Sequence, residues 1–186
     1  MPLDFVVRDL ILMKKFNINA VRNSHYPNHP KVYDLFDKLG FWVIDEADLE
    51  THGVQEPFNR HTNLEAEYPG AKNKLYNIKA HYLSDNSEYE LAYLDGAFTL
   101  VLRDVNHPSI IIWSLANETC YDRKHKTMHK STKQLDHITM VHYEGDLKAL
   151  SADTFSFMYP TFKIMERWRN NHTDENSKFE KPFDFV

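Results

Sequence analysis

The chain has 186 residues, 42% of them hydrophobic, and a formal net charge of −5, which is typical of one globular domain. The acidic balance argues against a protein that binds nucleic acid without sequence preference, because such a protein would show a basic stripe. The longest apolar runs, residues 10–13 and 110–113, are far too short to span a membrane, and the first residues lack a signal-peptide pattern. The single cysteine, Cys120, cannot form an internal disulfide, so the sequence predicts a reducing, cytoplasmic setting.

Helix-like and strand-like stretches alternate along the first half of the chain. Asp4 is suited to cap a helix that runs to about Lys15, with Val6, Leu10 and Met13 on one buried stripe. Three further elements are expected: a strand over 18–22, a helix over 31–39 that ends at Gly40, and a strand over 41–44. Residues 54–86 are polar and aperiodic, which predicts a long loop.

The second half continues the same alternation. Ser87 and Glu90 form a capping-box pattern that predicts a helix to Asp104, with Leu91, Leu94, Phe98 and Val101 on one face. The remaining expected elements are strands over 109–115, 140–143 and 155–159 and helices over 124–135 and 162–170.

This order predicts an α/β protein with about five parallel strands and flanking helices. Such a sheet is either an open doubly wound sheet or part of a (β/α)8 barrel. The chain has only five glycines, and no glycine-rich phosphate-binding pattern follows a strand, which disfavours the dinucleotide-binding form of the open sheet. Because a whole barrel takes about 250 residues, a barrel formed by this chain would be an incomplete (β/α)8 (TIM) barrel.

Polar residues gather where the predicted strands end, which is where active sites are built in such barrels. Glu118 directly follows the apolar run 110–115, and partial removal from water would favour the protonated carboxyl that a general acid needs. The alternative is an acidic residue that merely stabilises a helix N-terminus.

Glu50 and His52 are two residues apart, so in an extended segment their side chains point the same way. A carboxylate and an imidazole on one side could bind a divalent metal, or they could form a surface ion pair. Cys120 lies near Glu118, but its surroundings are acidic, so a catalytic thiolate is not expected there.

Four segments carry a stronger signal together than any one residue. They are residues 20–30 (AVRNSHYPNHP), 44–53 (IDEADLETHG), 103–118 (RDVNHPSIIIWSLANE) and, more weakly, 157–160 (FMYP). Together they resemble glycoside hydrolase family 2, and within it the β-galactosidases. The resemblance covers residues 2–182, and it implies that residues 1–186 are one partial catalytic barrel domain.

The resemblance also implies roles for individual residues. Glu118 would be the acid/base carboxylate, and Asn117 would contact the sugar next to the scissile bond. The residues that match the ligands of an active-site magnesium are Glu50, His52 and Glu118, and those that match the substrate-binding residues are Arg22, His25, Met158 and Tyr159. The substrate would be a terminal β-galactoside, hydrolysed with retention by a homo-oligomeric enzyme.

In this family the nucleophilic glutamate follows shortly after the position of Pro182, where this chain instead reads Phe183-Asp184-Phe185-Val186 and ends. One expectation is that the tail arises from a frameshift in the family's sequence. Two hypotheses follow: a β-galactosidase function of the parent enzyme, or a non-catalytic fragment with at most weak sugar or magnesium binding. Since retaining hydrolysis needs the nucleophile, the polypeptide alone is expected to be inactive.

Overall fold

A computed structural model of the chain describes residues 2–51, 83–84, 86–119, 121–146, 149–154, 156, 159–163 and 165–166. Its elements are, in chain order, α1 (Leu3–Lys15), β1 (Ala20–Arg22), α2 (Pro30–Leu39), β2 (Trp42–Glu46), the 3₁₀ helix η1 (Ser87–Tyr89), α6 (Glu90–Asp104), β3 (Ile110–Ser114), α7 (Arg123–Leu135) and β4 (Met140–His142). The expected alternation of helices and strands is confirmed. The predicted loop 54–86 lies almost wholly outside the described residues.

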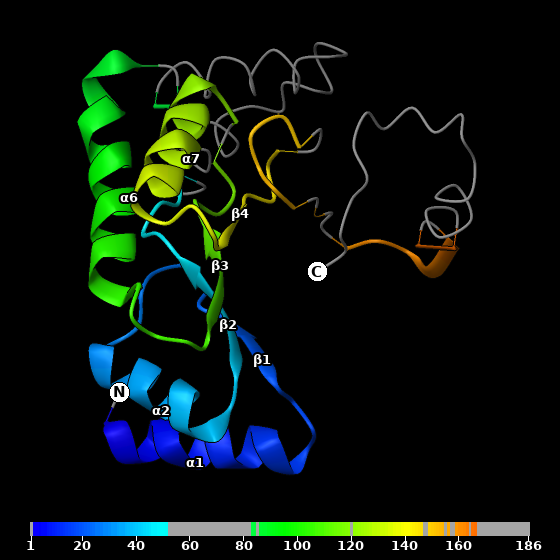
Figure 1. Cartoon of the computed structure of the whole chain (residues 1–186). Coiled ribbons are helices and arrows are strands. Elements are labelled where there is room, and N and C mark those ends of the chain that lie inside the picture. Colours follow the sequence, from blue (N-terminus) through cyan, green and yellow to red (C-terminus); the bar gives the residue numbers. More distant parts are fainter. Residues whose placement is uncertain are drawn as a thin grey trace, which may run out of the picture.

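The four strands form one sheet in the order β1-β2-β3-β4, and every pairing is parallel. Helices α1, α2, α6 and α7 all lie on one side of this sheet (Figure 1). A doubly wound sheet reverses its strand order and carries helices on both faces, whereas a barrel wall keeps sequential order with the helices outside. The described part is therefore an arc of a (β/α)8 barrel, and the alternative of an open doubly wound sheet is wrong.

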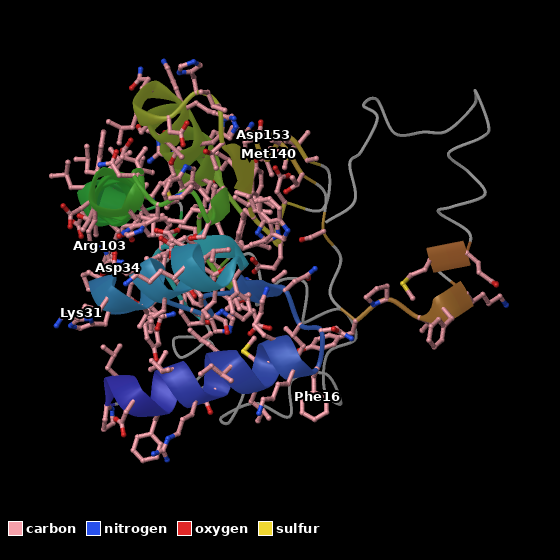
Figure 2. All side chains as sticks on the ribbon, turned by 60° about the horizontal axis from the view of Figure 1, so that its bottom comes forward. Phe16, Lys31, Asp34, Arg103, Met140 and Asp153 are labelled. Carbon is pink, nitrogen blue, oxygen red and sulfur yellow. The ribbon has the colours of Figure 1, made fainter. Side chains whose placement is uncertain are left out.

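The structure describes four strands where about five were predicted. Of the predicted strand 155–159, only Ser156 and Tyr159 are described, and neither belongs to a strand. The outer edge of β4 is partly paired by Asp153 instead: its N–H donates to the Val141 carbonyl (2.7 Å), and its Oδ2 accepts the Val141 N–H (2.9 Å). Figure 2 shows Asp153 beside Met140 at the start of this strand.

Strand β2 is longer than predicted, because it continues from Ile44 through Asp45 and Glu46, which are both fully buried. Successive side chains of a strand point to opposite faces. Asp45 faces α2, where it accepts hydrogen bonds from Tyr33 Oη (2.7 Å) and Asn23 Nδ2 (2.8 Å), and burial raises the pKa of its carboxyl to about 7. Asp45 thus lies between the sheet and α2, and the side chain of Glu46 points to the opposite face of the sheet.

The predicted buried stripe of α1 is confirmed, but its predicted cap is wrong. Leu10 is buried, and Val6 and Met13 pack half-buried against the core. The helix begins at Leu3, and Asp4 lies inside its first turn rather than at the cap. A carboxylate there still stabilises the helix through the macrodipole.

The predicted start and face of α6 also need correction. Asn86, one residue before the expected cap, accepts the Glu88 N–H (3.0 Å) and opens η1, which leads into the helix at Glu90. Of the predicted face, Val101 is buried and Leu94 and Phe98 are half-buried, but Leu91 is 80% exposed. The buried residues of the helix are Tyr93, Ala97, Leu100, Val101 and Asp104.

Helix α2 begins and ends as its sequence predicts. His29 accepts the Lys31 N–H (3.3 Å) at the cap, and Pro30 occupies the first turn, where a missing N–H costs nothing. Gly40 ends the helix with a φ of 68°, a left-handed conformation that favours glycine.

Two glycine substitutions are expected to change stability in opposite directions. Gly40→Ala should lower the free energy of unfolding by about 1 kcal/mol, because alanine is strained at a positive φ. Gly96→Ala should raise it by about 0.5–1 kcal/mol, because Gly96 lies inside α6 and an added Cβ has nothing within 4 Å. Urea denaturation of both variants checks the pair, and equal signs would contradict the assigned backbone conformations.

Candidate active site

One polar side chain from each strand lies at the carboxyl end of the sheet. They form a layer that we call the rim network: Arg22 of β1, Glu46 of β2, Ser114 of β3 and His142 of β4. Glu46, Ser114 and His142 are register partners across three strands. Ser114 Oγ donates to Glu46 Oε2 (2.7 Å) and lies 3.0 Å from His142 Nδ1, while Arg22 Nε donates to the same Glu46 oxygen (2.6 Å).

Three members of the rim network, Glu46, Ser114 and His142, are buried. Glu46 is fully buried and is held by Arg22 and by His25, whose Nδ1 lies 2.7 Å from Glu46 Oε1. Burial, with a smaller contribution from Arg22, lowers the pKa of His142 to about 4. His142 is therefore a neutral member of the layer near pH 7.

A second layer lies beyond the strand ends, where Glu50 pairs with Asn117 in an isolated parallel bridge. The Asn117 N–H donates to the Leu49 carbonyl (2.9 Å), and Asn117 Nδ2 donates to Glu50 Oε2 (2.6 Å). Asn117 Oδ1 accepts from Arg22 Nη2 (3.1 Å), which joins this layer to the rim network. The predicted site residues Arg22, Glu50 and Asn117 are thus brought together by side-chain contacts.

Glu118 follows Asn117 with a φ of 42°, so the chain turns sharply at this residue. Its N–H donates to Glu144 Oε1 (2.5 Å), and its carbonyl accepts from Thr51 Oγ1 (3.5 Å). Helix α7 begins only at Arg123, where Asp122 is the cap. The alternative in which Glu118 merely stabilises a helix N-terminus is therefore wrong.

Glu144 is a further carboxylate of the site that was not predicted from the sequence. It lies two residues after β4, and only 5% of its surface is exposed. Its Oε2 is 3.8 Å from Arg22 Nη2 and accepts no hydrogen bond from the described residues. Burial raises the pKa of Glu144 to about 7.

The segment after Glu118 is anchored by a buried aromatic cluster. Thr119 Oγ1 lies 2.8 Å from His125 Nε2 and 2.6 Å from Tyr143 Oη, and the His125 ring stacks on the Tyr143 ring at 4.4 Å. His125 Nδ1 accepts the Asp122 N–H (3.1 Å), so its other ring nitrogen carries the proton of the neutral form.

Acidification should weaken the fold through His125. Burial lowers its pKa from 6.5 to about 4, so between these values the unfolded chain binds a proton that the folded chain does not. The contribution to stability is complete above pH 6.5 and is lost as the pH falls toward 4. In His125→Gln, the loss of unfolding free energy between pH 7 and pH 4.5 should be smaller by about 2 kcal/mol. Urea denaturation at both pH values, with the exposed His137→Gln as control, measures the difference.

The other predicted site residues have different outcomes. Tyr159 is described, and its side chain is 89% exposed, so it lies in solvent rather than packed against the described rim residues. Met158 and His52 lie outside the described residues, as does Cys120. The substrate-binding roles of Met158 and Tyr159 stay predictions.

Of the three predicted magnesium ligands, only Glu50 and Glu118 lie within the described residues. Since Glu50 pairs with Asn117, Glu50 and Glu118 lie at the same end of the sheet, as a shared ion requires. Within the described ranges, no three His, Cys, Asp or Glu side chains are arranged to hold a metal ion. Because His52 is outside those ranges, the full ligand set stays a prediction.

Sequence reasoning missed Glu46, Ser114, His142 and Glu144. The signal for Glu144 was available, since it follows a predicted strand just as Glu118 does. Glu46 and Ser114 were placed at or near predicted strand ends, but nothing in one sequence shows that they are register partners.

Comparison with known proteins identifies the family of this chain. The family profile described as "Glycosyl hydrolases family 2, TIM barrel domain" matches residues 1–184. A β-galactosidase of Kluyveromyces lactis is 85% identical over 181 residues, which are 97% of this chain and 18% of that protein. A β-galactosidase of Vibrio vulnificus is 42% identical over 140 residues, which are 75% of this chain and 11% of that protein. The chain therefore spans less than a fifth of the length of these relatives.

Solved structures support the fold alone. A β-glucuronidase from Ruminococcus gnavus, in complex with uronic isofagomine, matches with a TM-score of 0.65 and 20% identity over 92% of this chain and 31% of that chain. A β-glycosidase from Bacteroides vulgatus matches with a TM-score of 0.60 and 23% identity over 92% of this chain and 20% of that chain. Within the described part of this chain, no helix is long and apolar enough to cross a membrane.

Proposed function

We propose that this chain, which belongs to the TIM-barrel domain of glycosyl hydrolase family 2, is part of the catalytic barrel of a β-galactosidase. The observation that carries the proposal is the arrangement of Glu118 next to Asn117, whose side chain contacts Arg22 and Glu50 at the carboxyl ends of the strands. Over 181 residues, the chain is 85% identical to the K. lactis β-galactosidase.

In the proposed mechanism, the Glu118 carboxyl group gives its proton to the glycosidic oxygen as the bond to the sugar breaks. A second carboxylate, from another part of the complete barrel, attacks the anomeric carbon from a position about 5–5.5 Å away from Glu118. Glu118 then accepts a proton from the water that releases galactose, so the configuration is retained. Asn117, His25, Met158 and Tyr159 would contact the sugar.

We also propose that Glu50, Glu118 and His52 hold a magnesium ion. Carboxylate oxygens are the ligands that this ion prefers, and Glu50 and Glu118 lie at one end of the sheet. The bound ion would supply positive charge beside the acid/base carboxylate. Glu50 Oε2, which accepts from Asn117 Nδ2, fixes the position of one ligand relative to the sugar site.

A chimera tests the proposed function. In this protein, the 181 matched residues of the K. lactis β-galactosidase are replaced by those of the present chain. We expect the chimera to hydrolyse o-nitrophenyl β-galactoside and to leave the corresponding β-glucuronide intact. A folded chimera with neither activity, or with the glucuronide as its better substrate, would contradict the proposal.

The polypeptide of these 186 residues alone is proposed to be inactive, since the covalent step needs a carboxylate that the family carries after the position of Pro182. We expect no release of o-nitrophenol above the buffer blank. Turnover that disappears in Glu118→Gln would show instead that the polypeptide carries its own nucleophile. The cytoplasmic location and the homo-oligomeric state of the parent enzyme are likewise proposals from the sequence.

A further inference from the structure

We propose that Glu144 is a positioning residue for the acid/base carboxylate, because it holds the backbone from which Glu118 projects. This inference rests on the proposed function. The contact that carries it is the hydrogen bond from the Glu118 N–H to Glu144 Oε1, at 2.5 Å.

The backbone at Glu118 needs such a contact. Its φ of 42° lies in the left-handed region, which costs a residue other than glycine about 1–2 kcal/mol. Such a conformation persists only where neighbouring groups fix it. Because Glu144 Oε1 accepts the N–H of Glu118 itself, this hydrogen bond stabilises the left-handed conformation of that residue.

The neighbour of Glu144 contributes a second contact to the same segment. Tyr143 Oη donates to the Thr119 carbonyl, and its ring stacks on His125 at 4.4 Å. Residues 143 and 144, which follow β4, thus hold residues 119 and 118, which follow β3. Two adjacent contacts fix the orientation of the peptide as well as its position.

Glu144 also lies beside the other half of the site. Its Oε2 is 3.8 Å from Arg22 Nη2, and the same nitrogen donates to Asn117 Oδ1 (3.1 Å). One buried side chain is therefore in contact with both the residue that orients Asn117 and the backbone of Glu118. With 5% of its surface exposed and one oxygen bound to the Glu118 N–H, Glu144 is not placed to touch substrate.

Two substitutions in the chimera separate the effect of the side-chain length of Glu144 from the effect of its charge. Glu144→Asp keeps the charge but is one methylene shorter, so the acceptor withdraws from the Glu118 N–H. Glu144→Gln keeps the length and an acceptor oxygen but loses the charge. The control is Asp146→Asn, a buried carboxylate nearby whose acceptor contacts are to residues 150–152.

The readout is kcat/KM for two substrates. Methyl β-galactoside needs its leaving oxygen to be protonated, whereas 2,4-dinitrophenyl β-galactoside leaves without an acid. We expect Glu144→Asp to lower kcat/KM about 10–100-fold for the methyl substrate and less than about threefold for the dinitrophenyl substrate. For Glu144→Gln, kcat/KM should stay within about threefold of the parent value for both substrates. For Asp146→Asn, any change in kcat/KM should be the same for both substrates.

The outcomes distinguish the two proposals. Equal losses on both substrates in Glu144→Asp, or a loss in Glu144→Gln as large and as selective as in Glu144→Asp, would overturn the positioning role. If the unmodified chimera is inactive, or if Glu118→Gln shows no selective loss on the methyl substrate, the proposed function itself fails.

Discussion

Replacing Glu118 by glutamine in the chimera is expected to lower kcat/KM for methyl β-galactoside by about a thousandfold, because a positioned general acid contributes about 10²–10⁴-fold. The amide has nearly the same shape, so the Glu118 N–H can still donate to Glu144 and the turn at this residue is kept. The expected defect is therefore chemical rather than structural, and steady-state kinetics measures it.

Glu88→Gln is the matched control, since Glu88 is an exposed carboxylate of η1. It should retain the activity of the parent chimera. A Glu118→Gln variant within about tenfold of that parent would exclude Glu118 as the general acid.

The largest expected effect on stability comes from Arg22→Met. This change leaves Glu46, which is fully buried, without the cation that lies 2.6 Å from it. Removing one partner of a buried ion pair costs about 3–5 kcal/mol, and since the Arg22 side chain is 31% exposed, we expect a loss of about 3 kcal/mol. Urea denaturation gives the free energy of unfolding.

A double-mutant cycle identifies the cause. Adding Glu46→Gln to Arg22→Met removes the buried carboxylate that has lost Arg22, so the double variant should be at least about 1 kcal/mol more stable than the Arg22 single variant. If the losses of unfolding free energy in the two single variants simply add in the double variant, the Arg22–Glu46 ion pair does not stabilise the rim network.

The order of elements was predictable because local patterns determine it. Pro30 and Gly40 mark the ends of α2 by backbone conformation alone, and the apolar run before Asn117 can hardly form anything but a buried strand. The start of α6 was misplaced, because Asn86 rather than Ser87 is the cap and it caps η1, whereas α6 itself begins at Glu90 without a side-chain cap. Leu91 was misassigned because periodicity predicts a stripe of apolar residues, whereas tertiary packing determines which side of the helix is buried.

The site was predictable in its location and less so in its contacts. Arg22, Glu50 and Asn117 follow or end strands, so their convergence at one end of the sheet followed from the fold. The burial of Asp45 and Glu46 did not follow from the fold. In a single sequence, charged residues after an apolar run predict the start of a loop. Their partners, such as Tyr33 for Asp45 and Ser114 for Glu46, are brought to them only by tertiary folding.

The most direct test of Glu118 as the acid/base of a retaining β-galactosidase is azide rescue of the Glu118→Gln chimera. With 2,4-dinitrophenyl β-galactoside, the galactosyl-enzyme forms without an acid but is hydrolysed slowly, because no base activates water. Azide is already an anion and needs no base. Added azide should therefore raise kcat for this variant by about tenfold or more, leave the parent chimera unchanged, and yield β-galactosyl azide. No acceleration by azide, or a product of α configuration, would contradict the assignment of Glu118.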